Sequence, residues 1–441
     1  MEAHANAVED VLVDGLSYKL KNSAKYVTDR KSVTYHPSGS NVYSPTTGTK
    51  VIKINLTGDS WLVPESVRVM FTLKNKDASN PLRTLSGPWS FFRRMRVLCG
   101  GQVVEDYDYN RVHEMFAILG TKEARDNGDV EGFGYRYDDD ANSDPNATLA
   151  TTLPGIAASS SKRVSFKPMS GLLSQSKWLP IRYCPVTIEL ELVSNATDPI
   201  VAATGSFASS TSENWEIEDV QLKADLCTLD NAVDNQIADH LLSGKPLPIN
   251  FQTYISQSQI LAAAQSSNFS VNVSRAVTRL ARVFIGLGGP ENPTAPDVRS
   301  KPWNTFFNPM DGDHTPAREL EYQVQIGSKL FPEYPVQSSS EAFAQLNKAV
   351  MDVKHPHSHT LSIKAKQYIK DKFIICAQTS KLAHAGFTGL NTRSGDLMTI
   401  KAKLVGGASA SPTAHHPTEI FIALESDQIL EIRDTGVQVF D

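Results

Sequence analysis

The stretch RVLCGGQVVEDYDYNRVHEMFAIL, residues 96–119, returns later in the chain as QVQIGSKLFPEYPVQSSSEAFAQL, residues 323–346. Aligned without a gap, the two stretches are identical at seven positions. The identical residues of the first stretch are Val97, Gly100, Tyr107, Glu114, Phe116, Ala117 and Leu119. Because the two stretches lie 227 residues apart, about half of the 441-residue chain, the match indicates that the second half of the chain repeats the first.

Three shorter matches run in the same order along both halves. They are Arg68-Val69 with Arg282-Val283, Thr187-Ile188 with Thr399-Ile400, and Val220 to Asp225 (VQLKAD) with Ile422 to Asp427 (IALESD). All matches are 202 to 227 residues apart, whereas a solenoid repeats every 20–50 residues or so. We therefore interpret the chain as one ancestral domain used twice in tandem.

Most of the remaining patterned segments predict β-strands. Their residues alternate between apolar and polar, are rich in β-branched types, and are separated by Gly, Pro, Asn and Ser clusters. The segments are 51–56, 66–73, 94–99, 186–193 and 215–226 in the first half, and 268–274, 278–287, 320–327, 372–378, 397–405 and 418–426 in the second. This pattern favours two antiparallel β-sandwiches.

Few segments have the pattern of a helix. The sequence predicts short helices over 110–119 and 338–351, so each half carries one directly after its repeated strand. A third helix is expected over 230–242, with Asp230 as its N-cap. Because it falls where one copy ends and the next begins, we interpret it as the connector between the two domains.

The first 45 residues stand apart from both copies. Apolar residues recur there every four positions, at Val8, Leu12, Leu16 and Leu20. Such spacing predicts a short amphipathic helix. We expect residues 1–45 to form an assembly arm outside the sandwiches, 46–228 the first domain and 229–441 the second. The alternative is a terminal helix that packs on its own domain.

Composition excludes several classes of protein. The formal net charge of −5 argues against a chain whose main surface grips nucleic acid. No run approaches the ~20 apolar residues of a membrane-spanning helix, and the N-terminus lacks the pattern of a secretory signal. The cysteines are far apart in apolar segments, so we expect buried free thiols. They are Cys99, Cys184, Cys227 and Cys376.

Long polar stretches interrupt both copies. They cover residues 136–165 and 194–214 in the first copy and 288–318 and 405–417 in the second. Polar segments of this length in a compact domain are commonly exposed functional loops. We expect them to leave one end of each sandwich and to build a raised surface.

No enzymatic motif is found, and two clusters of possible metal ligands favour solvated loops. His355, His357 and His359 would point to one side of an extended segment, but no glutamate follows them as in a cupin. The pair His415-His416 lies far from these histidines in the sequence and could join such a site only if the fold brought it close. The acidic run with Asp138, Asp139, Asp140 and Asp144 lacks the glycine and terminal glutamate of a calcium loop.

A third cluster combines basic and aromatic residues. Arg93, Arg94 and Arg96 flank Phe91 and Phe92, a combination that could stack bases and contact phosphates. Strand alternation instead predicts that Phe92 points inward and Arg93 outward. We expect the arginines to form structural ion pairs with acidic neighbours such as Glu105 and Asp106.

Several runs together resemble the double jelly-roll major capsid proteins of double-stranded DNA viruses, nearest to the polinton-like virus and virophage-like group. They are Trp89 to Phe92, RVLCGGQ with its helix, LLSQSKWLPIRYCPVTIELELV (172–193), LDNAVDNQIADHLLSGKPLPINF (229–251), GSKLFPEYPVQSSSEAF (327–343) and ILEIRDTGVQVF (429–440). The resemblance covers nearly the whole chain from about residue 50. It implies an all-β fold of two tandem eight-stranded antiparallel jelly rolls with a few short helices.

The resemblance also implies a function without a catalytic centre, metal or other cofactor. Three copies would form a pseudo-hexameric homotrimer, and trimers would tile an icosahedral shell in the virion. The expected partners are further copies of this chain and the penton and minor capsid proteins, with no specific nucleic acid; an internal membrane stays an open question. The arm would latch beneath neighbouring copies.

Two other functions stay open. The chain could be a β-sandwich protein that binds a carbohydrate or receptor through the loop at 136–165. It could also be a metal-dependent enzyme of the cupin type that uses His355, His357 and His359.

Overall fold

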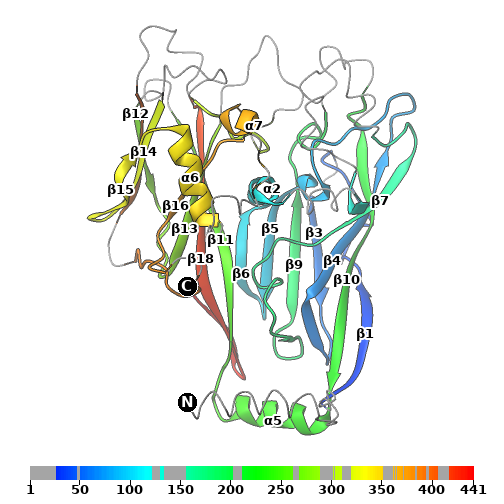
Figure 1. Ribbon diagram of the computed structural model, residues 1–441. Helices are drawn as coiled ribbons and strands as arrows, with labels where there is room; N and C mark the ends of the chain where they lie inside the picture. The colour runs from blue at the N-terminus through cyan, green and yellow to red at the C-terminus, as the bar shows by residue number, and fades with distance from the viewer. Residues whose placement is uncertain are drawn as a thin grey trace, which may run out of the picture.

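The computed structural model describes most of the chain. The described residues are 26–46, 50–121, 130–133, 155–201, 211–261, 268–288, 301, 303–309, 319–350, 361, 363, 365–370, 372–382, 385–393, 397–405 and 417–441. They form four antiparallel β-sheets, which stand as two sandwiches side by side (Figure 1).

The first sandwich consists of strands from the first half of the chain. One sheet has the strand order β1-β10-β4-β7, and the facing sheet has the order β3-β9-β5-β6. Their bounds are β1 Val27–Tyr35, β3 Val51–Leu56, β4 Trp61–Asn75, β5 Phe92–Cys99, β6 Gln102–Asp108, β7 Ser161–Phe166, β9 Val186–Leu192 and β10 Trp215–Leu229. Two short strands, β2 (Val42–Tyr43) and β8 (Leu179–Pro180), extend the first sheet.

The second sandwich repeats this arrangement. Its sheets have the orders β11-β18-β13-β16 and β12-β17-β14-β15, and β19 pairs with β18. The bounds are β11 Leu247–Ile260, β12 Asn268–Val273, β13 Leu280–Gly288, β14 Glu319–Ile326, β15 Lys329–Val336, β16 Ile374–Gln378, β17 Met398–Val405, β18 Glu419–Arg433 and β19 Gly436–Phe440.

Both sandwiches have the same topology. Taking the eight strands of each in chain order, one sheet has the order first-eighth-third-sixth and the other has second-seventh-fourth-fifth. This is a double-sheet jelly roll of eight strands. The predicted fold class of two tandem eight-stranded antiparallel jelly rolls is therefore confirmed. We call the sandwich of β1 to β10 the first roll and that of β11 to β19 the second roll.

The sequence repeats fall on equivalent strands. Arg68-Val69 lies in β4 and Arg282-Val283 in β13, the third strands of the two rolls. Val220 to Asp225 and Ile422 to Asp427 lie in the eighth strands, β10 and β18. The longest repeat covers the fourth and fifth strands and the following helix in each roll. The duplication predicted from the sequence is therefore a duplication of structure.

Alternating burial explains the strands. Along β3, Val51, Lys53 and Asn55 are exposed while Ile52, Ile54 and Leu56 are fully buried. β18 differs, because its residues 420–428 are all buried. Its two faces are both covered, one by the core of the second roll and the other in part by the first roll. The predicted burial of the four free cysteines is confirmed.

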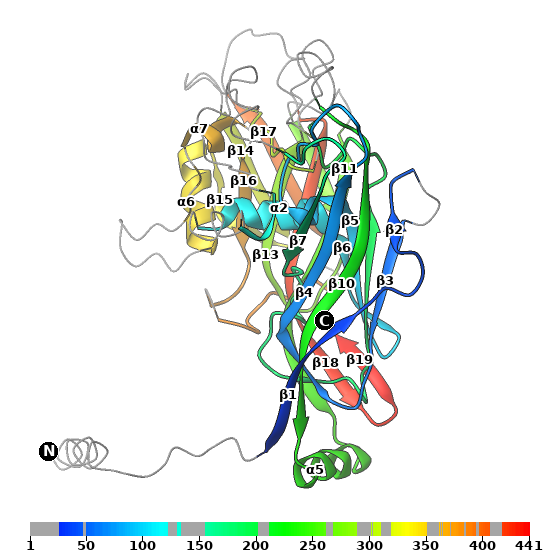
Figure 2. The ribbon, with the colours of Figure 1, turned by 90° about the vertical axis from the view of Figure 1, so that its right-hand side faces the viewer.

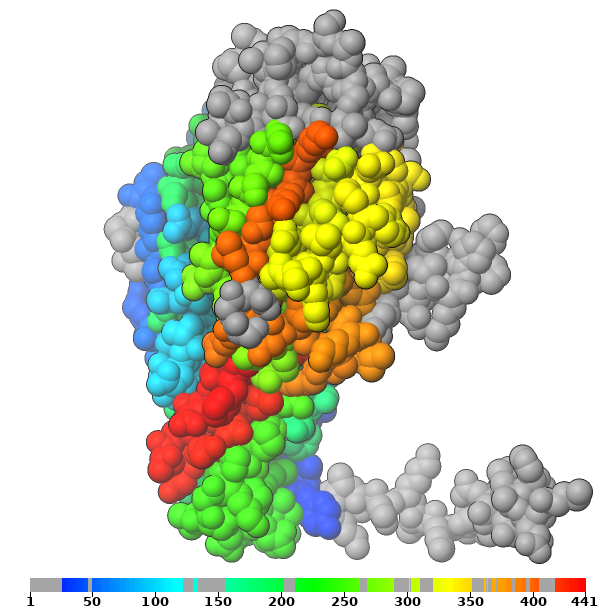
Figure 3. All heavy atoms as spheres, turned by 90° about the vertical axis from the view of Figure 1, so that its left-hand side faces the viewer, coloured from blue at the N-terminus to red at the C-terminus, as the bar shows by residue number. Residues whose placement is uncertain are grey.

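The helices lie outside the sheets. Within the described ranges they are α2 (Tyr109–Leu119), α5 (Asn231–Leu242), α6 (Ser339–Val350) and α7 (Ala365–Lys370), with a 3-10 turn, η1, at Pro88–Phe91. α6 begins with a capping arrangement in which the Glu341 N–H donates to the Ser338 hydroxyl at 3.1 Å. α6 and β15 form a prominent part of one face of the second roll, drawn in yellow in Figure 3.

Helix α5 connects the two rolls, as predicted. It lies between β10 and β11 in the chain and crosses beneath both rolls (Figures 1 and 2). Asp230 occupies its N-cap position, as predicted, although its side chain makes no capping hydrogen bond. The main-chain oxygen of Asp230 instead accepts hydrogen bonds from Val233 and Asp234, each at 3.0 Å.

The predicted N-terminal arm over residues 1–45 needs a correction. Residues from Val27 to Tyr35 are strand β1, which pairs with β10 along almost its whole length. The segment is polar and mostly exposed, so its sequence lacked alternation, but main-chain pairing holds it in the sheet. Val8, Leu12, Leu16 and Leu20 lie outside the described residues. The boundary between 228 and 229 stays a prediction.

A half-buried histidine, whose ring nitrogen Nδ1 is shielded from solvent, gives the first roll a pH-dependent stability. His113 of α2 stacks on Trp89 with ring centroids 4.3 Å apart, and burial lowers its pKa from 6.5 to about 4. As the pH falls below 6.5, His113 becomes protonated in the unfolded chain but stays neutral in the folded chain. The folded state should therefore lose about 3 kcal/mol between pH 6.5 and pH 4 through this residue.

The substitution His113→Phe keeps an aromatic ring beside Trp89 and removes the titrating group. Urea unfolding at pH 7 and at pH 4.5 should show a smaller loss of stability in the variant than in the wild type. Equal losses in both proteins would contradict the role assigned to His113.

Candidate functional site

The two rolls meet at a seam where strand β6 and helix α2 of the first roll face strands β11 and β18 of the second. At Gly171 the main chains of the two rolls come into direct contact. A Cβ atom placed on Gly171 would lie 1.4 Å from the main-chain oxygen of Gln252 in β11. Only glycine fits at this point, so the loop at 169–175 rests directly on the first strand of the second roll.

Beside this contact, a buried carboxylate bridges the two rolls. Glu105 of β6 is 2% exposed and accepts hydrogen bonds from the Gly171 N–H at 2.8 Å and from the Thr253 hydroxyl of β11 at 2.9 Å. The Ser170 hydroxyl also donates to it. Burial raises the pKa of Glu105, while these three donors favour its ionised form. The Glu105 carboxylate therefore links β6 and the loop at 169–175 of the first roll to β11 of the second.

Helix α2 extends the seam with an ion pair. Arg111 Nη1 lies 2.5 Å from Glu419 Oε1 at the start of β18, and its guanidinium stands 4.5 Å from the ring centroid of Phe421. The Arg111 side chain is only 8% exposed. A guanidinium so far removed from water depends on its carboxylate partner.

Aromatic side chains fill the space between these polar contacts. The ring of Phe116 in α2 packs against Tyr254 of β11 and Phe284 of β13, with centroids 4.7 and 4.9 Å apart. Elsewhere along the seam the indole N–H of Trp303 donates to the main-chain oxygen of Asp198 at 2.8 Å. Close packing, buried charge and hydrogen bonds thus join the two rolls into one block.

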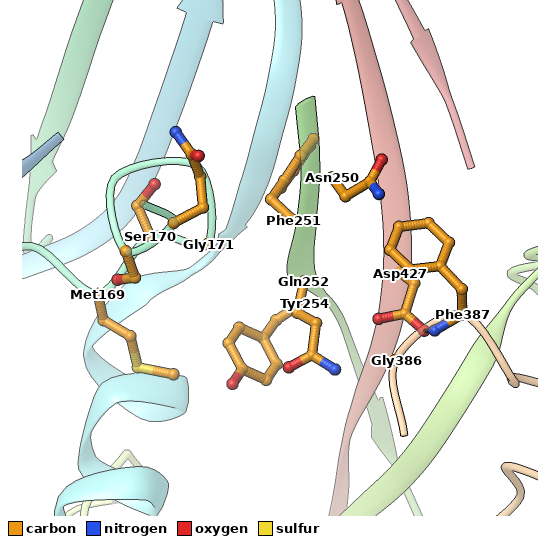
Figure 4. Close-up of a pocket in the computed structure, with 12 residues that line it drawn as sticks. Met169, Ser170, Gly171, Asn250, Phe251, Gln252, Tyr254, Gly386, Phe387 and Asp427 are labelled. Carbon is orange, nitrogen blue, oxygen red and sulfur yellow. Dashed lines mark hydrogen bonds between the residues drawn. The ribbon is translucent and has the colours of Figure 1, made fainter. Parts of the chain in front are cut away.

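A cavity of about 520 Å³ opens at this seam. Figure 4 shows the loop at 169–171 on one side, β11 behind, and Phe387 beside Asp427 on the other. The lining residues are Met169, Ser170, Gly171, Ser174, Gln175, Asn250, Phe251, Gln252, Tyr254, Gly386, Phe387 and Asp427. The cavity therefore combines aromatic rings, amides and one carboxylate.

Asp427 is the charged residue of this cavity. It is 1% exposed, and one oxygen, Oδ2, accepts the Phe387 N–H at 2.7 Å. The other oxygen, Oδ1, is buried and has no hydrogen-bond partner among the described residues. In Figure 4 one carboxylate oxygen points away from Phe387, toward the side where Gln252 and Tyr254 lie.

The arginine cluster predicted from the sequence forms ion pairs. Phe92 is buried and Arg93 is exposed, as predicted. Arg93 pairs with Glu191 at 3.2 Å, Arg94 with Asp106 at 2.6 Å, and Arg96 with Glu189. These contacts confirm the structural interpretation.

The prediction that Glu105 pairs with these arginines is wrong. Glu105 points into the seam instead. The register between β5 and β6 shifts after Val97, so Val104 and Glu105 are both buried. The bulge therefore removes Glu105 from the arginine face of the sheet.

The other candidate sites lie outside the described residues. They are His355, His357, His359, His415, His416, Asp138, Asp139, Asp140 and Asp144. Within the described part of the chain, no group of three or more His, Cys, Asp or Glu side chains could hold a metal ion. No helix in that same part is long and apolar enough to cross a membrane.

Similarity to known proteins is found in structure and not in sequence. No protein-family model matches the chain, and no curated protein matches it. A chain of the PBCV-1 virus capsid is 11% identical, and the match covers 96% of this chain and 99% of that chain with a TM-score of 0.62. The Faustovirus major capsid protein is 10% identical, with 94% and 92% covered and a TM-score of 0.56.

A chain of the Sputnik virophage matches as well, with 8% identity, 96% and 90% coverage and a TM-score of 0.61. This chain has the double jelly-roll fold of viral major capsid proteins. The resemblance expected from the sequence is thus confirmed as a likeness of fold. Since PBCV-1 and Sputnik match this double jelly roll equally well, a place in the polinton-like or virophage-like group stays a prediction.

Proposed function

We propose that this double jelly-roll chain is a major capsid protein, a structural building block that assembles with copies of itself into a virus shell. The observation that carries the proposal is the match in fold over almost the whole length of the PBCV-1 capsid chain. Sputnik and Faustovirus chains support it over similar lengths. No part of the proposed function requires a catalytic group or a cofactor.

The geometry of the seam suits this role. Two rolls of the same topology, joined by Gly171, Glu105 and Arg111, give each chain two similar wedges held in a fixed relation. Three such chains around an axis would present six similar wedges, a pseudo-hexameric outline that tiles a surface. Contacts that are weak one by one hold such a lattice together when they are multiplied.

Within this proposal, the homotrimer packs against neighbouring homotrimers in an icosahedral shell, and penton and minor capsid proteins complete the particle. Electron microscopy of the purified chain at rising concentration tests the first step. Shells or sheets with hexagonal order support the proposal. Material that stays as separate single chains at every concentration contradicts it.

We also propose that the segment with Val8, Leu12, Leu16 and Leu20 latches onto neighbouring copies. Since β1 begins at Val27, the deletion that tests this removes residues 1–25 and leaves β1 in its sheet. The deleted chain should form trimers with the wild-type mass by light scattering but fewer shells by microscopy. Loss of the trimers themselves would contradict the latch.

A further inference from the structure

The duplication allows the cavity at the seam to be compared with its counterpart in the same molecule. Asp225 of β10 and Asp427 of β18 are equivalent, because both end the matching segments VQLKAD and IALESD. In the first roll, Asp225 lies opposite Ser32 of β1. In the second, Asp427 lies opposite Gln252 of β11. Strands β1 and β11 are the first strands of their rolls, so Ser32 and Gln252 are equivalent too.

The two carboxylates differ in their partners. Asp225 accepts hydrogen bonds from Arg30 Nη2 at 2.6 Å and from the Ser32 hydroxyl at 2.5 Å. These two contacts hold its pKa below the ordinary value. Arg30 stands two residues before Ser32, and the residue two before Gln252 is Asn250. The second roll thus lacks the arginine that its counterpart supplies.

The cavity occupies the place of the missing arginine. Asn250, Gln252 and Asp427 all line it, and Asp427 Oδ1 is buried without a partner among the described residues. Arg279 does not fill this place, because its Nε–H donates to the main-chain oxygen of Asp427 and its Nη2–H to that of Phe440. A buried carboxylate oxygen without a donor is costly.

We propose that the cavity at the seam binds a guanidinium group that pairs with Asp427, as Arg30 pairs with Asp225 in the first roll. Asp427 Oδ1 accepts its N–H groups, and the side-chain oxygens of Asn250 and Gln252 are further acceptors at the rim. The ring of Tyr254 lines the cavity and offers a face on which a planar cation stacks. The ring of Phe387 already has the guanidinium of Arg279 at 5.4 Å from its centroid, so it contributes to the wall of the cavity and not to the stacking. The volume of about 520 Å³ holds such a group with its alkyl stem. This inference does not depend on the capsid role.

Calorimetric titration with ethylguanidinium tests the site, with ethylurea as the neutral control of the same shape. The wild-type chain should bind ethylguanidinium saturably and ethylurea at least about tenfold more weakly. Asp427→Asn should weaken ethylguanidinium binding by about tenfold or more. No binding to the wild type, or an equal affinity in Asp427→Asn, would overturn the proposal.

A second variant tests the site independently, so that the proposal stays testable when Asp427→Asn does not fold. Asn250→Arg places an arginine at the position equivalent to Arg30, on an exposed part of β11, where it should fill the cavity itself. It should abolish ethylguanidinium binding and raise the thermal midpoint. Gln259→Arg adds the same charge to an exposed site on the same strand and should leave probe binding unchanged. Undiminished binding in Asn250→Arg would overturn the proposal.

The guanidinium could come from a second copy of the chain or from a separate molecule. Light scattering of the same variants separates the two sources. Weaker self-association of Asn250→Arg than of Gln259→Arg assigns the group to an arginine of a second copy. Equal self-association of the two variants assigns it to a separate guanidinium compound.

Discussion

Replacing Gly171 with alanine is expected to lower the free energy of unfolding by about 3 kcal/mol. The added Cβ would lie 1.4 Å from the main-chain oxygen of Gln252 and 2.6 Å from its carbonyl carbon. Since main-chain atoms on both sides form this contact, no side-chain rotation relieves it. The loop of the first roll and β11 of the second must move apart, which also stretches the hydrogen bond from Gly171 to Glu105.

Urea unfolding measures this loss, with Gly386→Ala as the matched control. Gly386 lines the same cavity, but a Cβ on it would meet no heavy atom within 4 Å. The control should change stability by less than about 0.5 kcal/mol. If Gly171→Ala and Gly386→Ala unfold at the same urea concentration, the close contact at the seam is not as described.

Replacing Glu419 with glutamine is expected to cost about 3 kcal/mol. The substitution leaves the guanidinium of Arg111 buried between the rolls without its carboxylate. Buried charges that lose their partner destabilise a fold far more than exposed ones do. The loss should therefore show in the urea midpoint of the whole chain.

Two further variants test the reason for this loss. Asp106→Asn removes a carboxylate from Arg94, whose pair is exposed (41% and 33% for the two side chains), and should cost less than about 1 kcal/mol. Adding Arg111→Met to Glu419→Gln removes the stranded charge and should recover much of the stability. A double variant no more stable than Glu419→Gln would contradict an uncompensated charge as the cause.

The sandwich fold could be predicted because the information is local. Segments such as Val51–Leu56 alternate at a period of two, and their burial follows that alternation. The duplication added information about topology, which the alternation within a single strand does not carry. It showed that strands β5 and β14 occupy equivalent places, so one topology had to serve both halves of the chain.

The seam between the rolls could not be predicted, because it depends on contacts between distant segments. The inward turn of Glu105 follows from a one-residue bulge, and its partner Thr253 lies 148 residues away. Gly171 carries no signal in the sequence that separates it from an ordinary turn glycine. Strand β1 was missed for a different reason. Its polar side chains did not indicate a strand, whereas main-chain pairing with β10 holds the segment in the sheet.

The cavity could be predicted from the sequence only in part. The sequence repeat already paired Asp225 with Asp427, but it did not show which residues face them. Only the strand registers reveal that Arg30 corresponds to Asn250. The exposed Arg30 supplies a guanidinium partner for Asp225, whereas Asn250 at the equivalent position supplies none for Asp427.

The measurement that tests the capsid proposal most directly is the solution mass of the purified chain by light scattering, followed by negative-stain imaging of the same peak. A homotrimer of this chain has a mass of about 145 kDa, three chains of 48.3 kDa each, and we expect this mass with a hexagonal outline, or larger shells. A mass of 48.3 kDa at every concentration would contradict it.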